Sequence, residues 1–361
     1  MRFLHYIIVS LIFASCVCTK EDTETNIIDL QKYTDDGIKN SDIFNFIECI
    51  PLETNNKCLL SDINKVIFFK NEYYILDRKV QKSVFVFNND GKFIRKIGIL
   101  GHGHGEYPSI TDFTIDEQKK RIIILSAPSR VYVYDLNGKF QFSKEISKSL
   151  IWNIISTKDG FIGTTNYLTY TEGNEAFLFF GFDKDFNEIG KWENVLEQQM
   201  YSPACVSTVL QHQNGQIYYW DNYTNSIFTM NDIKRGMKKE YTIEFSNPMP
   251  EEYFCSWEKF MENQFKYDFI MEAITCGKQH IIAYIHNAKQ HIAIVNDNGK
   301  VKINGSYKEI IPTLFNGKDN EMIYPISAES YLSNWKKKVK TRYNKLISAG
   351  DNYLLLRLKV K

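Results

Sequence analysis

A short segment recurs along this chain and constrains its fold more than any other feature. Each copy has an alternating apolar strand, a turn that contains Asn or Asp followed by Gly, and a second strand. The clearest copies are Lys79–Lys96, Arg130–Lys144 and His291–Lys302. Such turns between alternating strands predict β-hairpins. A hairpin repeated at long, regular spacing indicates a closed array of small sheets, which is a β-propeller.

The spacing of the turns gives the size of one unit. Successive turns at Gly91, Gly138, Asn187 and Asp232 are 47, 49 and 45 residues apart, whereas Gly299 follows only after 67 residues. The longer interval predicts an insertion in this part of the chain.

We place the inserted segment at about residues 250–273 and expect it to be helical. Its apolar residues recur every three to four positions, which is the period of a helix that packs one face. Pro248 and Pro250 precede it and favour a helix start there. Trp257, Phe260 and Met261 are expected to point inward, against the propeller.

Each unit is expected to hold four strands. One strand precedes the hairpin, as in Tyr73–Asp77, and another is supplied by segments such as Ile110–Asp116. The chain length without the insertion then corresponds to six blades, with seven as the alternative. Phe46–Leu52 is predicted to share a blade with Tyr353–Leu358, which would close the ring without an open edge strand.

The first residues are predicted to be a lipoprotein signal peptide, residues 1–15. Arg2 is followed by the apolar run Leu4–Ala14, which is too short to span a bilayer as a helix. Small residues then precede Cys16, which we predict to be lipidated. An ordinary signal peptide or an uncleaved anchor is the alternative. We expect a lipidated N-terminus and flexible tether over residues 16–42 and the propeller domain over residues 43–361.

Lys20-Glu21-Asp22 lies just beyond the predicted lipidation site. This group resembles the surface-export signal of Bacteroidetes lipoproteins, and a plain solvated tether is the alternative. We therefore expect the protein at the outer membrane, held by its N-terminal lipid and facing the cell surface.

Charge and cysteine content exclude some partners. The chain has 44 Lys and Arg against 43 Asp and Glu, so no general attraction to nucleic acid is expected. Lys336–Lys338 with Lys340 is interpreted as a solvated face.

The cysteines match no zinc-binding spacing. Most are expected to be buried free thiols, with Cys49 and Cys58 as the only nearby pair.

One loop carries a resemblance to a known family. The segment 96–107 contains Gly101-His-Gly-His-Gly-Glu-Tyr107 and is followed by Asp112-Phe113 and Asp116. This pattern resembles the six-bladed propeller lipoproteins common in Bacteroides and relatives, which are distantly similar to NHL-repeat propellers. The likeness covers essentially the whole mature chain. The family usually has Pro where this chain has His104. The resemblance implies fold and location, and it implies no defined activity.

The same loop supplies the candidate binding residues His102, His104, Glu106 and Tyr107. Two imidazoles and a carboxylate can ligate a metal. The favoured interpretation is structural, because the glycines would let the chain turn between blades. A glycine-rich phosphate site needs a helix after it, and a strand is predicted there, so nucleotide binding is not expected.

No cofactor is predicted, and Ca²⁺ in the central channel is the alternative. Acidic residues at strand ends usually cap backbone groups, but in a propeller they also lie near the channel, where they could ring a Ca²⁺ ion. These residues are Asp77, Asp112, Asp116, Asp135 and Asp221.

The functional prediction is non-catalytic binding of a glycan, peptide or partner protein. The sequence has no nucleophile elbow, HExxH helix or Walker loop. The alternative is a propeller hydrolase or lyase with a Ca²⁺ or His/Asp centre in the central channel. Converging carboxylates and histidines in the channel would favour the enzyme, and aromatic and amide side chains would favour the binder.

Overall fold

The structure is a computed structural model. It describes residues 25–168, 176–199, 210–213, 215–254, 256–309, 313–317 and 320–361. The predicted signal peptide, Cys16 and Lys20–Asp22 lie outside the described residues.

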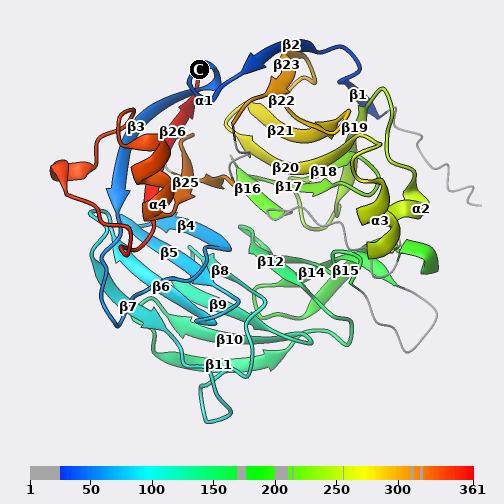
Figure 1. The fold of residues 1–361 in the computed structure, drawn as a ribbon. Helices are drawn as coiled ribbons and strands as arrows, with labels where there is room; N and C mark the ends of the chain where they lie inside the picture. Colours follow the sequence, from blue (N-terminus) through cyan, green and yellow to red (C-terminus); the bar gives the residue numbers. More distant parts are fainter. Residues whose placement is uncertain are drawn as a thin grey trace, which may run out of the picture.

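Six small antiparallel sheets stand around a central axis and confirm the six-bladed propeller (Figure 1). From the innermost strand outward, the first three blades are β4 Lys65–Phe69, β5 Glu72–Asp77, β6 Ser83–Asn88 and β7 Phe93–Ile97; β8 Asp112–Asp116, β9 Arg121–Ser126, β10 Arg130–Asp135 and β11 Phe140–Glu145; and β12 Asn153–Ser156, β13 Gly160–Thr164, β14 Phe177–Asp183 and β15 Glu188–Asn194.

The other three blades follow the same plan. They are β16 Leu210–Gln213, β17 Gln216–Asp221, β18 Ser226–Met230 and β19 Lys238–Glu244; β20 Phe269–Cys276, β21 Gln279–His286, β22 Lys289–Asn296 and β23 Val301–Tyr307; and β24 Phe315–Asn316, β25 Met322–Ile326, β26 Leu354–Val360 and β3 Phe44–Pro51. Short helical segments lie at Glu197–Gln199, Ala328–Ser330 (α4), Tyr331–Trp335 and Arg342–Asn344.

The recurrent turn has the same chemistry in successive blades. Asn88 accepts hydrogen bonds through Oδ1 from the N–H groups of Asp90 and Lys92, both at 2.9 Å. Asp135 makes the equivalent bonds in the next blade. Gly91 has a φ of +79°, and a Cβ there would lie 2.3 Å from the Pro51 carbonyl oxygen. The side-chain turn and this glycine therefore fix the hairpin locally.

The hydrophobic core lies between neighbouring blades, because the middle strands are buried on both faces. In β9, Ile122 and Ile124 pack toward the first blade, whereas Ile123 and Leu125 pack toward the third. Alternate side chains of a strand point to opposite faces. Each middle strand thus reads as a continuous apolar run.

The ring closes by pairing β3 with β26, as the sequence predicts. Leu354 pairs with Pro51 and Leu356 with Cys49, so the last blade takes its outer strand from the N-terminal region. The Glu48 carboxylate of β3 forms an ion pair with Arg342, with 2.5 Å between Oε1 and Nη2, and a second ion pair with Arg357. Burial opposes ionisation of Glu48, but the two guanidinium groups outweigh it and hold the pKa of this carboxyl below its usual value.

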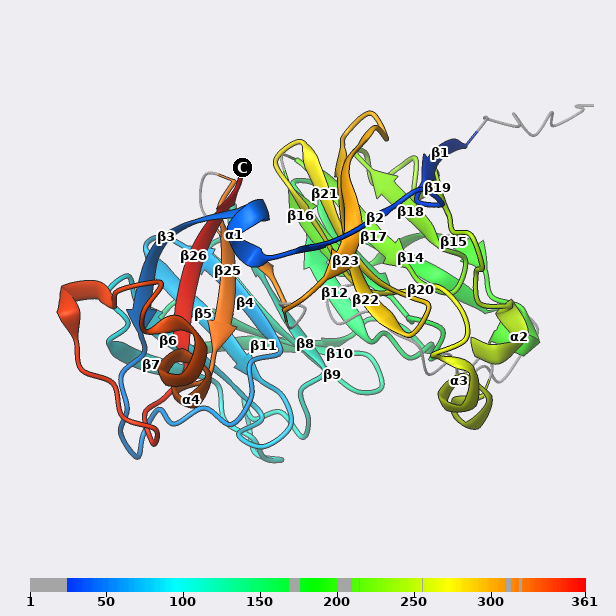
Figure 2. The same ribbon diagram turned by 45° about the horizontal axis from the view of Figure 1, so that its top comes forward.

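The predicted tether over residues 16–42 needs correction in its second half. Residues Asn26–Asp29 (β1) pair in parallel with β19, and Thr34–Ile38 (β2) pair in parallel with β23. This N-terminal arm runs across the outer edges of two blades (Figure 2). Ile28 and Leu30 are buried against the fourth blade. The prediction missed the arm because its short strands pair only with distant outer strands. The helix α1, Asn40–Ile43, links the arm to β3.

The predicted insertion is only partly helical. Its helices are α2 Glu251–Phe254 and α3 Trp257–Asn263, and they lie at the outer side of the ring in Figure 1. Residues 269–273 belong instead to β20, the innermost strand of the fifth blade. Phe260 is buried as expected, but Trp257 and Met261 are 60% and 44% exposed. A helix of two turns buries one narrow face, here the face that carries Phe260. In the described part of the chain, no helix is long and apolar enough to cross a membrane.

Candidate functional site

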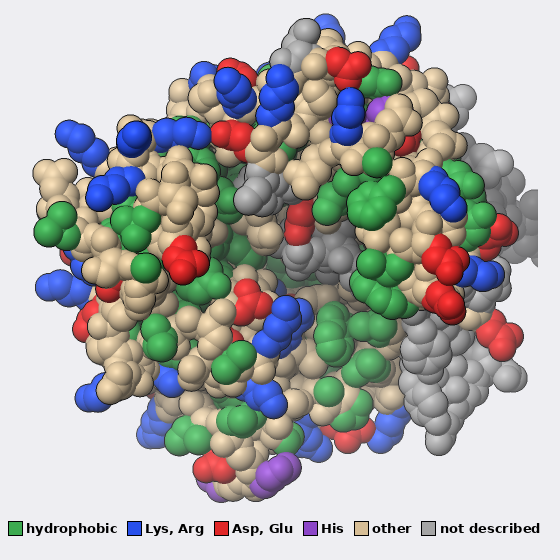
Figure 3. Space-filling view, viewed as in Figure 1, with side chains coloured by type: hydrophobic (Ala, Val, Ile, Leu, Met, Phe, Trp, Pro, Cys, Tyr) green, Lys and Arg blue, Asp and Glu red, His purple; other side chains and the backbone are tan. Residues whose placement is uncertain are grey.

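The innermost strands of all six blades surround a central channel, which is the candidate functional site. Its cavity has a volume of about 250 Å³. Figure 3 shows the hollow at the centre of one face of the molecule. Polar residues of the lining are Asn64, Lys65, Arg78, Thr111, Asp112, Thr114, Glu117, Asn153, Ser156, Gln211, His212, Gln213 and Asn316. Apolar residues of the lining include Val66, Phe68, Leu76, Ile115, Ile155, Leu210, Ile274, Leu314 and Phe315.

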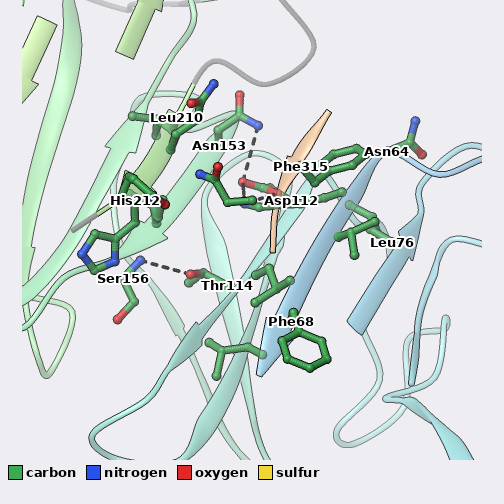
Figure 4. A pocket seen from close by; sticks show the side chains of 18 of the residues that line it. Asn64, Phe68, Leu76, Asp112, Thr114, Asn153, Ser156, Leu210, His212 and Phe315 are labelled. Carbon is green, nitrogen blue, oxygen red and sulfur yellow. Dashed lines mark hydrogen bonds and ion pairs between the residues drawn. The ribbon is translucent and has the colours of Figure 1, made fainter. Parts of the chain in front are cut away.

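The first residues of three neighbouring inner strands form a polar cluster at one end of the channel. Lys65 Nζ of β4 lies 2.9 and 3.0 Å from the two carboxylate oxygens of Asp112 of β8. Asp112 also accepts the backbone N–H of Ile154 at 2.9 Å and an amide N–H of Asn153 at 3.4 Å (Figure 4). The ammonium and carboxylate thus neutralise each other, and the pair ties three blades together.

Arg78 stands beside this pair. Its backbone N–H donates to Asn64 Oδ1 at 2.7 Å, and its guanidinium lies 5.6 Å from the ring centroid of Trp152. The only hydrogen bond of the guanidinium to a described residue is a long one, 3.4 Å to the Thr111 carbonyl oxygen. The ring and this bond hold the guanidinium in place while leaving most of its donors available.

The inner strands run in the same direction along the channel. Two residues beyond the contact of Asp112 with Ile154, the Thr114 hydroxyl accepts the N–H of Ser156 at 3.0 Å. This constant offset between β8 and β12 means that their first residues share one end of the channel and their last residues share the other. The middle is mainly apolar.

The other end of the channel carries His212 and Glu117. The imidazole of His212 lines the channel and has an exposed surface. The protein packed around it disfavours the charged form and lowers the pKa of His212, and the negative charge of Glu117 opposes the shift. Gln213 donates to Asn320 Oδ1 at 2.9 Å and links the fourth blade to the sixth.

The five aspartates singled out in the sequence do not gather in the channel, since only Asp112 lines it. Asp77 accepts the N–H of Ser61 at 2.7 Å, and Asp116 pairs with Arg121 and Lys184, both at 3.1 Å. Asp135 caps its hairpin turn, and Asp221 binds Thr224, Tyr167 and the N–H of Tyr223. The described residues contain no group of three or more His, Cys, Asp or Glu side chains that could hold a metal.

The predicted binding loop lies at the outer rim beside β10 and β11, away from the channel. Tyr107 is buried and donates its hydroxyl to the Lys82 carbonyl oxygen at 3.1 Å. Glu106 accepts the N–H of Gly103 at 2.8 Å, within the loop. His102 and His104 are exposed, and His104 packs edge-on against Phe140. Two of the four residues thus have structural contacts, and binding by this loop remains a prediction.

Sequence reasoning missed the channel residues Lys65, Arg78, Asn153 and His212. Three of them lie on the innermost strands and Arg78 directly follows β5, but in the sequence most inner strands carry no turn signal of their own. Aligning the first two blades on their turns would have marked Lys65 beside Asp112, because the two residues stand 26 positions before Gly91 and Gly138. The distance from inner strand to turn differs in the later blades, so Asn153 and His212 carry no such signal. The buried, free thiols of Cys49, Cys58 and Cys276 agree with the cysteine prediction.

Fold and channel define this molecule as a six-bladed β-propeller with a narrow central cavity. The chain belongs to the DUF4934 family, a domain of unknown function whose model matches residues 25–354. Among curated proteins, none matches the sequence.

Two examples show the likeness of this chain to solved structures. A Bacteroides fragilis protein described as exported has a TM-score of 0.73 and 16% identity, covering 93% of this chain and 100% of its own. A member of the DUF4221 family from Bacteroides vulgatus has a TM-score of 0.60 and 7% identity, covering 88% of this chain and 98% of its own. At these identities the likeness concerns the fold alone.

Proposed function

We propose that this protein is a non-catalytic binding protein of the outer membrane whose ligand, a glycan, peptide or segment of a partner protein, enters the central channel. The observation that carries this proposal is the composition of the channel wall. Amide, hydroxyl and apolar side chains from six blades line one concave cavity, and fixed polar groups that converge beside apolar surface are typical of a binding site.

The same wall disfavours the hydrolase or lyase alternative. Catalysis of that type would use carboxylates or histidines that converge on one point. In the channel, Asp112 is engaged by Lys65 at one end, and Glu117, which follows β8, lies beside His212 at the other end. Among the described residues, Glu117 and His212 belong to no group of three or more such side chains. The amides Asn64, Asn153 and Gln213 fit the binder.

The location rests on the N-terminal sequence. A basic residue, an apolar run and Cys16 support lipid attachment, and Lys20-Glu21-Asp22 supports exposure at the cell surface. The Bacteroides fragilis protein of the same fold is described as exported, which agrees with this proposal.

Binding to arrays of oligosaccharides and peptides tests the proposed function, with two matched Trp variants. His212→Trp fills the channel at a residue open to it, and His102→Trp places the same side chain on the outer rim. We expect wild type and His102→Trp to bind the same probes and His212→Trp to lose them. Binding that His102→Trp abolishes and His212→Trp preserves would place the site on the rim loop and contradict the proposal. Circular dichroism checks that both variants fold.

A further inference from the structure

The two ends of the channel carry opposite charges that the protein leaves unpaired. At one end, the ion pair of Lys65 with Asp112 is internally neutral, so the guanidinium of Arg78 remains as a net positive charge. At the other end, Glu117 carries a negative charge beside His212, whose pKa is lowered. Among the residues that the structure describes, neither Arg78 nor Glu117 forms an ion pair.

The distance between the two charges sets the length of a matching ligand. Asp112, the first residue of β8, lies at the same end of the channel as Arg78. Glu117 lies five residues further along the chain, directly after the last residue of β8. At about 3.3 Å per residue this is roughly 16 Å. The side chains reach inward from both ends, so an extended chain of about four residues spans the gap.

The cavity also limits the width of the ligand. A volume of about 250 Å³ admits a single extended chain, whereas a helix is about 10 Å wide with its side chains. The apolar middle, with Ile115, Ile155 and Phe315, suits small apolar side chains. A neutral oligosaccharide would leave the half-buried guanidinium of Arg78 without an anionic partner and would make no use of the charge of Glu117, which is exposed at the other end.

From these observations we infer that the channel binds a short extended peptide in one orientation, with its free α-carboxylate at Arg78 and its α-amino group at Glu117. This inference rests on the proposed function and names its ligand class. A guanidinium presents paired N–H donors that match a carboxylate. Arg78 is already held by Trp152 and Thr111, so little ordering is needed on binding. A peptide entering in reverse would place like charges together at both ends.

Calorimetry with tetra-alanine as the probe tests the inference. Three forms are compared: the free peptide, its C-terminal amide and its N-acetyl derivative. We expect each modification to weaken binding to wild type by about tenfold or more, as for loss of a charge-assisted hydrogen bond. Arg78→Gln should bind the free peptide and the amide equally, and Glu117→Gln should bind the free and acetylated forms equally. Arg235→Gln and Glu252→Gln, at exposed sites away from the channel, should behave as wild type.

The outcomes separate this inference from the proposed function. Equal binding of the free peptide and the amide to wild type, or unchanged discrimination in Arg78→Gln, would overturn the inference. If wild type binds oligosaccharides of the array but not tetra-alanine, and His212→Trp abolishes that binding, the channel remains the site and the inference of a peptide ligand is wrong. Tetra-alanine binding that persists in His212→Trp would overturn both.

Discussion

At the scale of single residues, His280 shows how the interior handles a titratable group. The imidazole lies among the rings of Tyr218, Trp220 and Tyr241, at centroid distances of 5.8, 5.7 and 6.0 Å. Its Nδ1 is 3.0 Å from the Thr275 hydroxyl. Burial lowers the pKa of His280 to about 4, and the charge of Asp297 opposes the shift only partly. The native state therefore keeps this side chain neutral.

This burial predicts a loss of stability in mild acid. As the pH falls below 6.5, the unfolded chain binds a proton at His280, whereas the folded chain binds it only near pH 4. The stabilising contribution is complete above pH 6.5 and is lost between pH 6.5 and 4, by roughly 2 kcal/mol at pH 5. Urea unfolding at pH 7 and pH 5 measures it.

His280→Gln is the control, because glutamine cannot titrate. Its unfolding free energy should fall less than that of wild type between the two pH values. An equal fall in both proteins would mean that other groups account for the acid sensitivity.

At the scale of the secondary-structure elements, the two faces of α3 differ sharply. Phe260 is 8% exposed and contacts Phe254 and Phe269 at ring-centroid distances of 5.9 and 5.2 Å. Trp257 and Met261 lie on the solvent side of the same helix. Phe260 therefore anchors α3 to the fifth blade, beside Phe254 of α2, which is fully buried.

Alanine substitutions on the two faces test this asymmetry. Phe260→Ala should lower the free energy of unfolding by about 3 kcal/mol or more, because it removes a buried ring and leaves a cavity. Trp257→Ala should change it by less than about 1 kcal/mol, since most of that ring stays in water. Chemical denaturation measures both. A larger effect of Trp257→Ala than of Phe260→Ala would show that the helix packs through Trp257, which the sequence also predicted to point inward.

At the scale of the whole molecule, the N-terminal arm brings the propeller close to its predicted anchor. Because pairing with the fourth blade begins at Asn26, only about ten residues separate Cys16 from the folded domain. Ten extended residues reach at most about 35 Å. The tether is therefore shorter than the sequence suggested.

Cys16→Ser tests the predicted anchor. Several acyl chains on one cysteine make membrane attachment stable, so the variant should leave the membrane fraction or accumulate as unprocessed precursor. Fractionation and metabolic lipid labelling measure this. The lipoprotein prediction would be wrong if the wild-type protein took up no lipid label and fractionated in the same way as Cys16→Ser.

Replacing Lys20, Glu21 and Asp22 with Ala while retaining Cys16 separates anchoring from orientation. The protein should remain in the membrane fraction and become protected from protease added to intact cells. Wild type that already resists the protease would place the propeller in the periplasm.

The sequence by itself determined the blade. Asn88 with Gly91 and Asp135 with Gly138 specify hairpin turns through contacts within a few residues, and continuous apolar runs such as Ile122–Leu125 specify middle strands buried on both faces. These local features, repeated at one spacing, were enough to predict six blades and a ring closed by the two ends of the chain. The predicted end of the helical insertion was wrong because a buried strand and an apolar helix face are difficult to distinguish in a short segment.

Only the tertiary structure decided what lies in the channel and what lies at the rim. The pair of Lys65 with Asp112 joins residues 47 positions apart, and that of Gln213 with Asn320 joins residues 107 positions apart. Such contacts depend on which strand of each blade is innermost and on how the blades meet, and no local preference encodes either. The conspicuous loop with His102 and His104 was therefore visible in the sequence, whereas Arg78 and Glu117 acquire a shared role only when the ring closes.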